Sequence, residues 1–101
     1  MTELANSKGA INTMTIGLAR SLAPDIRVNA VCPGFVDTAW ALSWQSEQSY
    51  EIFKQGLITA APLKSIPDAA DIADAILWLS ERALRVTGQC IVIDSGAHLV
   101  A

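Results

Sequence analysis

The chain has 101 residues, with seven basic against ten acidic side chains and a formal net charge of −3. Hydrophobic residues make up 51% and charged residues 17%, which excludes a disordered chain. The sequence has no Lys/Arg cluster, which argues against binding to nucleic acid or to an anionic membrane surface. No apolar stretch approaches the roughly 20 residues of a membrane span, and no signal-peptide core is present, so we expect a soluble, cytoplasmic chain that forms one domain or part of one.

Residues 7–22 have a helical period. At about 100° per residue, one stripe of this helix carries Lys8, Ile11, Thr15, Leu18 and Leu22. Pro24 ends the helix, because proline disfavours helical backbone before it. The short β-branched run that follows, residues 26–32, predicts a strand buried on both faces.

Residues 35–63 give weaker signals. Trp40 and Trp44 are four positions apart, and Tyr50, Phe53 and Leu57 repeat a helical spacing. We expect a helical turn or two within an otherwise irregular insert.

Residues 68–80 predict a second helix. Asp68 and Asp71 lie in its first turn, where carboxylates suit the positive end of the helix dipole. Residues 89–94 predict a second apolar strand. Because two apolar strands separated by a helix are typical of a right-handed βαβ unit, the sequence predicts an α/β chain with a parallel sheet.

Counting residue types removes several kinds of site. His98 is the only histidine, which excludes a metal site with two histidines, and we expect it at the surface or in a subunit contact. The closest two glycines are eight positions apart, so neither a GxGxxG nor a GxxxxGK phosphate loop is present in these residues. Cys32 and Cys90 do not make a disulfide framework, and we expect buried free thiols, as in a reducing compartment.

Three segments carry a family resemblance by their order and spacing. They are Ser7-Lys8-Gly9-Ala10, the run RVNAVCPGFVDT at 27–38, and the stretch from Pro67-Asp68 through Thr87-Gly88-Gln89 to Asp94-Ser95-Gly96. Together they resemble the C-terminal part of a short-chain dehydrogenase/reductase: the end of the Tyr-x-x-x-Lys helix, the sixth strand with its Pro-Gly turn, and the last helix and strand. The resemblance implies the C-terminal part of a Rossmann-like, doubly wound parallel sheet, incomplete as a domain.

The family's mechanism gives Lys8 a role by resemblance. A tyrosine phenol acts as general acid/base while a hydride moves between the nicotinamide and an alcohol or carbonyl. A lysine one helical turn later lowers the pKa of that phenol, which is near 10 when free, and binds the nicotinamide ribose. Lys8 matches this lysine, although a solvated lysine near a helix start is the plain alternative.

One departure from the family pattern is serious. Leu4 stands where the family has its tyrosine, and the catalytic serine and glycine-rich loop would lie upstream of this sequence. We therefore expect the chain to be about the last two-fifths of such an enzyme and to be inactive alone.

The resemblance places NAD or NADP against Lys8, Pro33, Gly34, Val36 and Thr38. Gly34 would let the backbone approach the nicotinamide, or the turn is an ordinary strand end. Thr38 would contact the carboxamide or the diphosphate, or it caps the helical turn that follows.

Aromatic residues suggest where other molecules bind. Trp40 and Trp44 would line a lid over a small alcohol or carbonyl substrate, or they simply pack. Trp78 falls on the polar face of its helix, a placement typical of an interface, so we hypothesise a homo-oligomer in the intact parent. No metal, nucleic acid or membrane partner is expected. The alternative to an oxidoreductase portion is a non-catalytic piece that persists only by packing on a partner subunit.

Overall fold

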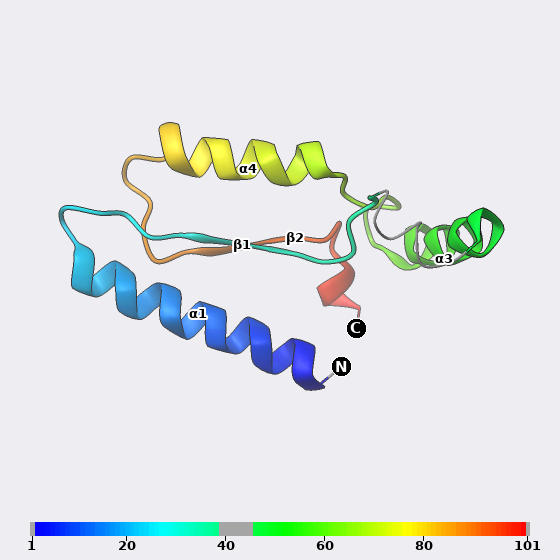
Figure 1. The fold of residues 1–101 in the computed structure, drawn as a ribbon, viewed down its shortest axis with the longest axis horizontal. Coiled ribbons are helices and arrows are strands. Elements are labelled where there is room, and N and C mark those ends of the chain that lie inside the picture. Colours follow the sequence, from blue (N-terminus) through cyan, green and yellow to red (C-terminus); the bar gives the residue numbers. More distant parts are fainter. Residues whose placement is uncertain (1, 39–45, 101) are drawn as a thin grey trace. The chain divides into compact units, whose positions relative to one another are not determined.

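The computed structural model describes residues 2–38 and 46–100, with side chains from residue 9 onward. Its elements, in chain order (Figure 1), are α1 (Thr2–Leu22), β1 (Ala30–Pro33), α3 (Glu47–Ala60), α4 (Ala69–Glu81), β2 (Cys90–Ile93) and the short 3₁₀ helix η1 (Ala97–Leu99). They form two compact units: unit 1 comprises Met1–Cys32 with Ala75–Val92, and unit 2 comprises Pro33–Asp74 with Ile93–Ala101. None of the described helices is long and apolar enough to cross a membrane.

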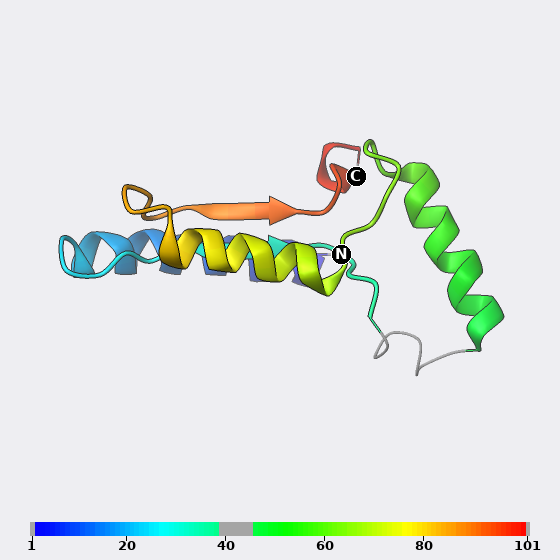
Figure 2. The same ribbon diagram turned by 90° about the horizontal axis from the view of Figure 1, so that it is seen from above.

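The strands β1 and β2 pair in parallel. The Ala30 N–H donates to the Gln89 carbonyl at 2.8 Å, and the Gly34 N–H donates to the Ile93 carbonyl at 3.2 Å. Both bonds join residues 59 positions apart (89 − 30 and 93 − 34), so the register is constant and the strands run the same way, as Figure 2 shows. The predicted parallel pairing of two strands is confirmed, in a two-stranded sheet.

The first strand is shorter than the sequence predicts, beginning at Ala30 rather than at residue 26. Side chains just before it bond to loops and helix ends instead of extending the strand. The Asn29 side chain donates to the Val86 carbonyl and accepts from the Gln89 N–H, at 2.9 and 3.1 Å. Such side-chain bonds compete with a regular ladder, which is why the apolar run overestimates the strand.

The second helix and strand differ from the prediction by one residue at each end, spanning Ala69–Glu81 and Cys90–Ile93. Asp68 and Asp71 define the start of α4, because each backbone N–H donates to the carboxylate of the other at 2.9 Å. This reciprocal pair satisfies N–H groups that a helix start leaves unpaired.

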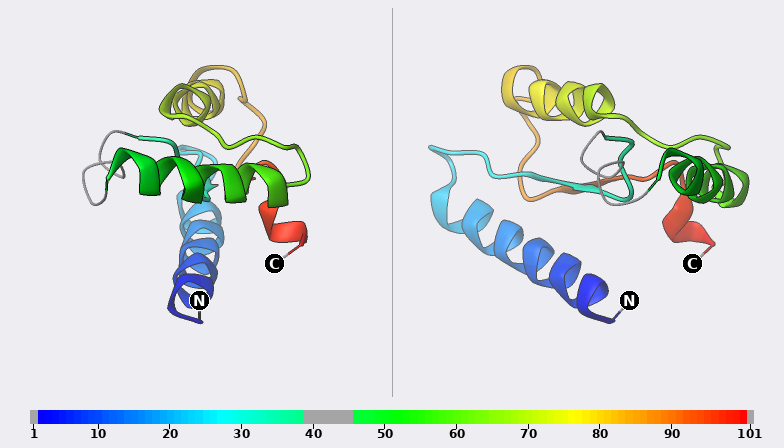
Figure 3. Two further views of the ribbon diagram at one scale, coloured as in Figure 1. Left: turned by 90° about the vertical axis from the view of Figure 1, so that its right-hand side faces the viewer. Right: turned by 45° about the vertical axis from the view of Figure 1, so that its right-hand side comes forward.

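The insert holds more helix than the sequence predicts. α3 runs for 14 residues where only a turn or two is expected. Ser46 caps it, since its hydroxyl accepts from the Ser49 N–H at 3.1 Å. The turn after α3 lies beside the segment after β2 (Figure 3), where the Leu63 N–H donates to the Ser95 carbonyl at 3.0 Å.

In unit 1, α1 and the end of α4 cover opposite faces of the strands (Figure 1). Within residues 9–22 of α1, Thr15 and Ala19 are buried, each 4% exposed, whereas Leu18 is 43% exposed. The predicted stripe is therefore only partly the packed face. Small side chains suit this contact, because the Ala19 methyl lies 3.6 Å from where a Cβ on Gly88 would stand.

A disulfide joins the two strands, so the expectation of free thiols at Cys32 and Cys90 is wrong. The Cα atoms lie 6.4 Å apart, within the usual range for a disulfide. Parallel pairing brings these residues together across 58 positions of sequence, which spacing alone does not reveal.

Arg27 is expected to stabilise unit 1 through the end of α4. Its guanidinium donates to the carbonyls of Leu79, Ala83 and Ser80 at 2.7, 2.9 and 2.9 Å. Removing it in Arg27→Met should lower the free energy of unfolding by about 1.5–3 kcal/mol, because these carbonyls lose a charged donor. Urea unfolding followed by circular dichroism measures this, with the exposed Arg85→Met as control; equal effects of the two substitutions would refute the assignment.

Gly34 has a packing reason to be glycine. A Cβ at this position would stand 2.8 Å from the Asp94 Cβ. Gly34→Ala should therefore destabilise the chain by about 1–3 kcal/mol, as overpacking does. Gly56→Ala is the matched control, since nothing lies within 4 Å there, and should stabilise α3 by about 0.5–1 kcal/mol. Thermal unfolding checks the sign of each effect, and a stabilising Gly34→Ala would contradict the structure.

Candidate functional site

The segment after β1, residues Gly34–Thr38, brings together most of the residues expected to bind a cofactor. Pro33 ends β1 and is exposed, whereas Gly34, Val36 and Thr38 are half-buried. The segment follows the carboxyl end of a parallel strand, where open α/β sheets bind their ligands. Gly34 packs against Asp94, so its close approach to another residue does not by itself require a cofactor.

Asp37 fixes this segment to two others. Its backbone N–H donates to the Pro67 carbonyl at 3.1 Å, in a parallel bridge with Asp68. Its carboxylate accepts from the Tyr50 hydroxyl through Oδ1 and pairs with the Lys54 ammonium through Oδ2 at 3.0 Å. Both carboxylate oxygens of Asp37 are therefore engaged by α3.

The three ionisable groups of this cluster shift one another's pKa values. The hydrogen bonds from Tyr50 and Lys54 hold the pKa of Asp37 below its usual range. Chiefly through its hydrogen bond to Asp37, the pKa of Tyr50 is raised above its ordinary value, and the same partner raises the pKa of Lys54. The arrangement favours a protonated phenol, a carboxylate and an ammonium together.

A second carboxylate cluster lies at Asp94, and sequence reasoning missed its pairing with His98. Asp94 is buried and accepts from the Gly96 and His98 N–H groups at 3.0 Å, while the His98 imidazole Nδ1 lies 2.9 Å from Oδ1. Burial raises the pKa of Asp94, but the hydrogen bonds from His98 and Gly96 outweigh it and hold that pKa below the usual range. His98 is half-exposed, as expected at the surface, and both its N–H and its imidazole contact Asp94 in the turn after β2.

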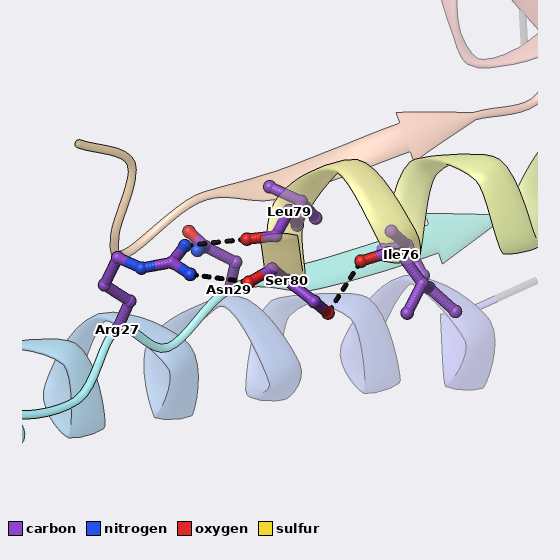
Figure 4. Close-up of a pocket in the computed structure, with 6 residues that line it drawn as sticks. Arg27, Asn29, Ile76, Leu79 and Ser80 are labelled. Atoms are coloured by element: carbon purple, nitrogen blue, oxygen red, sulfur yellow. Dashed lines mark hydrogen bonds between the residues drawn. The ribbon is translucent and has the colours of Figure 1, made fainter. Parts of the chain in front are cut away.

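A pocket of about 350 Å³ lies in unit 1 between β1 and α4 (Figure 4). Its lining residues are Arg27, Asn29, Val31, Ile76, Leu79 and Ser80. The polar groups there already have partners: the Arg27 guanidinium bonds to α4 carbonyls, and the Ser80 hydroxyl donates to the Ile76 carbonyl at 2.8 Å. The pocket offers packing surface rather than groups that would recognise a ligand.

Several expected site residues are not placed by the structure. Lys8 lies within α1, but its side chain is outside the described part of the chain. Trp40 and Trp44 also lie outside the described residues. Among the residues that are described, no group of three or more His, Cys, Asp or Glu side chains could hold a metal ion.

Comparison with known proteins connects this arrangement to a family. The family profile described as enoyl-(acyl carrier protein) reductase matches residues 2–98. The chain is 39% identical over 95 residues to the short-chain dehydrogenase/reductase homolog YusR of Bacillus subtilis, covering 94% of this chain and 68% of that protein. It is 35% identical over 99 residues to glucose 1-dehydrogenase 2 of the same organism, covering 96% of this chain.

A solved structure gives the same result. The crystal structure of a small-chain dehydrogenase in complex with NADPH superposes with a TM-score of 0.78 at 35% identity, over 90% of this chain. The chain spans 40% of that protein and 37% of the glucose 1-dehydrogenase. Sequence and fold agree over nearly the whole chain, which therefore belongs to the short-chain dehydrogenase/reductase family.

Proposed function

We propose that this chain is the C-terminal portion of an NAD(P)-dependent oxidoreductase that interconverts an alcohol and a carbonyl compound. The observation that carries the proposal is the half-buried segment Gly34–Thr38 at the carboxyl end of β1, in a chain that matches the family over residues 2–98. A relative of the same fold binds NADPH, which supports a nicotinamide cofactor, either NAD or NADP.

In this proposal the segment after β1 contributes the nicotinamide side of the cofactor site. Pro33, Gly34 and Val36 supply backbone, and the Thr38 hydroxyl supplies a hydrogen-bonding group. Lys8 would bind the ribose and lower the pKa of a phenol that this sequence does not supply at Leu4. When bound, the cofactor would supply or accept the hydride.

The chain fits only part of the cofactor. The spacing of its six glycines excludes a GxGxxG loop, the usual cradle for the diphosphate. We infer that the diphosphate and adenosine are held by residues that this sequence lacks, and that the 101-residue chain has no dehydrogenase turnover.

Exposed apolar side chains support the proposal that other parts of the intact protein cover this surface. Ile11, Ile76, Leu77 and Trp78 are 38, 48, 54 and 48% exposed. We propose that the remainder of the domain covers part of this surface, and that the α4 face with Trp78 contacts a second copy in a homo-oligomer. The same exposure favours the second candidate function, a non-catalytic piece that packs on a partner subunit.

Binding measurements with each half of the cofactor distinguish the oxidoreductase portion from the non-catalytic piece. Nicotinamide mononucleotide should bind the chain with a Kd in the millimolar range, about −4 kcal/mol, because one side of the site is present. Backbone amide shifts in nuclear magnetic resonance spectra should be confined to Gly34–Thr38 and its neighbours, and Thr38→Ala should abolish them. Adenosine diphosphate should produce no such shifts.

The control for this experiment is Thr13→Ala, which changes an exposed threonine of α1. Equal responses to both nucleotides, or shifts that survive in Thr38→Ala, would refute the cofactor assignment and favour the non-catalytic alternative. Micromolar binding of whole dinucleotide would contradict the proposed lack of a diphosphate cradle.

A further inference from the structure

The chain contains one Tyr-x-x-x-Lys spacing, at Tyr50 and Lys54 of α3, whereas Leu4 stands four positions before Lys8. Both side chains contact the same partner, Asp37, in the segment proposed to bind the cofactor. We infer that Asp37, Tyr50 and Lys54 form a latch whose role is positioning: it holds the segment Gly34–Thr38 on α3, and Tyr50 takes no part in proton transfer. This inference rests on the proposed function only in assigning Thr38 to the cofactor site.

Two residues of the segment, Phe35 and Asp37, contact α3. Phe35 contacts the rings of Tyr50 and Phe53, with centroids 6.3 and 5.3 Å apart, and Asp37 binds Tyr50 and Lys54. Tyr50, Phe53 and Lys54 share one face of α3 by their i, i+3 and i+4 spacing. Two kinds of contact, aromatic at Phe35 and polar at Asp37, therefore join the segment to the same face of the helix.

The other side of Asp37 is also fixed. Its backbone bond to Pro67 and its bridge with Asp68 hold it to the start of α4, while its side chain holds it to α3. Thr38 is the next residue in the chain. Fixing Asp37 at both backbone and side chain thus restricts where the Thr38 backbone can lie.

The geometry separates a latch from a catalytic pair. A catalytic tyrosine needs its phenol beside the ammonium, so that the positive charge stabilises the phenolate. Here the phenol donates a hydrogen bond to a carboxylate, and the Lys54 ammonium pairs with that carboxylate while lying 6.0 Å from the Tyr50 ring centroid. Tyr50 is also 4% exposed, and its hydroxyl is engaged by Asp37.

The experiment uses the fact that Tyr50 is the only tyrosine in the chain. The ultraviolet absorbance of tyrosinate, followed against pH, reports this residue alone. Tyr50 should titrate above the ordinary value near 10, because Asp37 favours the protonated phenol. Asp37→Asn should lower its pKa, and Lys54→Gln should raise it further.

The matched control is Glu51→Gln, on the same turn of α3. Because Glu51 is the smallest of the influences that raise the pKa of Tyr50, this substitution should lower that pKa far less than Asp37→Asn does. A wild-type Tyr50 that titrates at or below 10 would overturn the latch and would indicate a lysine-activated phenol. If Asp37→Asn does not fold, the wild-type titration and the Lys54→Gln shift still decide the question.

Amide hydrogen exchange provides the second readout. Tyr50→Phe and Asp37→Asn should each speed exchange of the backbone amide of residue 37 about fivefold, the loss expected from one hydrogen bond. The Asp37 pKa is lowered in the fold, so the latch is complete above the usual value near 3.9 and is lost as pH falls through the lower pKa of the folded chain.

Glu51 and Asp68 are the other acids near the cluster, and Asp37→Asn distinguishes their titration from that of Asp37. In that variant the acid-induced rise in exchange should disappear, and its persistence would overturn the inference. Neither readout requires a nucleotide, so the latch can fail while the nicotinamide mononucleotide experiment succeeds, and the reverse.

Discussion

The parallel pairing of β1 with β2 determines which residues meet at the ends of the two strands. A constant offset of 59 residues, seen at Ala30 and at Gly34, means that the residue after β1 must lie beside the residue after β2. That is why Gly34 meets Asp94, and why a side chain at residue 34 would collide with it. The turn that we propose to lie beside the nicotinamide is thus shaped first by packing within the fold.

The protonation of Tyr50 depends on which charged group it contacts more than on its spacing from Lys54 in the sequence. Tyr50 and Lys54 reproduce the spacing of the family's catalytic pair, yet both bind the Asp37 carboxylate. A carboxylate stabilises the protonated phenol, whereas an unpaired ammonium would stabilise the phenolate. The same two residue types can therefore serve as an anchor or as an acid/base pair, according to which charge stands nearest the phenol.

The sequence predicts the parallel strands and places α4 to within one residue at each end, because apolar runs and the Asp68/Asp71 pair are local signals. It overextends β1, since the Asn29 side chain binds residues 57 and 60 positions away. The disulfide and the Asp37–Tyr50 bond also escape prediction, because they depend on register and on tertiary packing. The Asp94–His98 pair was within reach, as four-residue spacing across a strand end is visible in the sequence.

Amide hydrogen exchange of the backbone measures the central pairing directly. Our account predicts that the amides of Ala30 and Gly34 exchange slowly and to a similar degree, because both donate across the same parallel register. The amides of Arg27 and Asn29, which precede the strand, should exchange faster. If Ala30 and Gly34 exchange as fast as those loop amides under conditions where α1 stays protected, the two strands do not pair and the account is wrong.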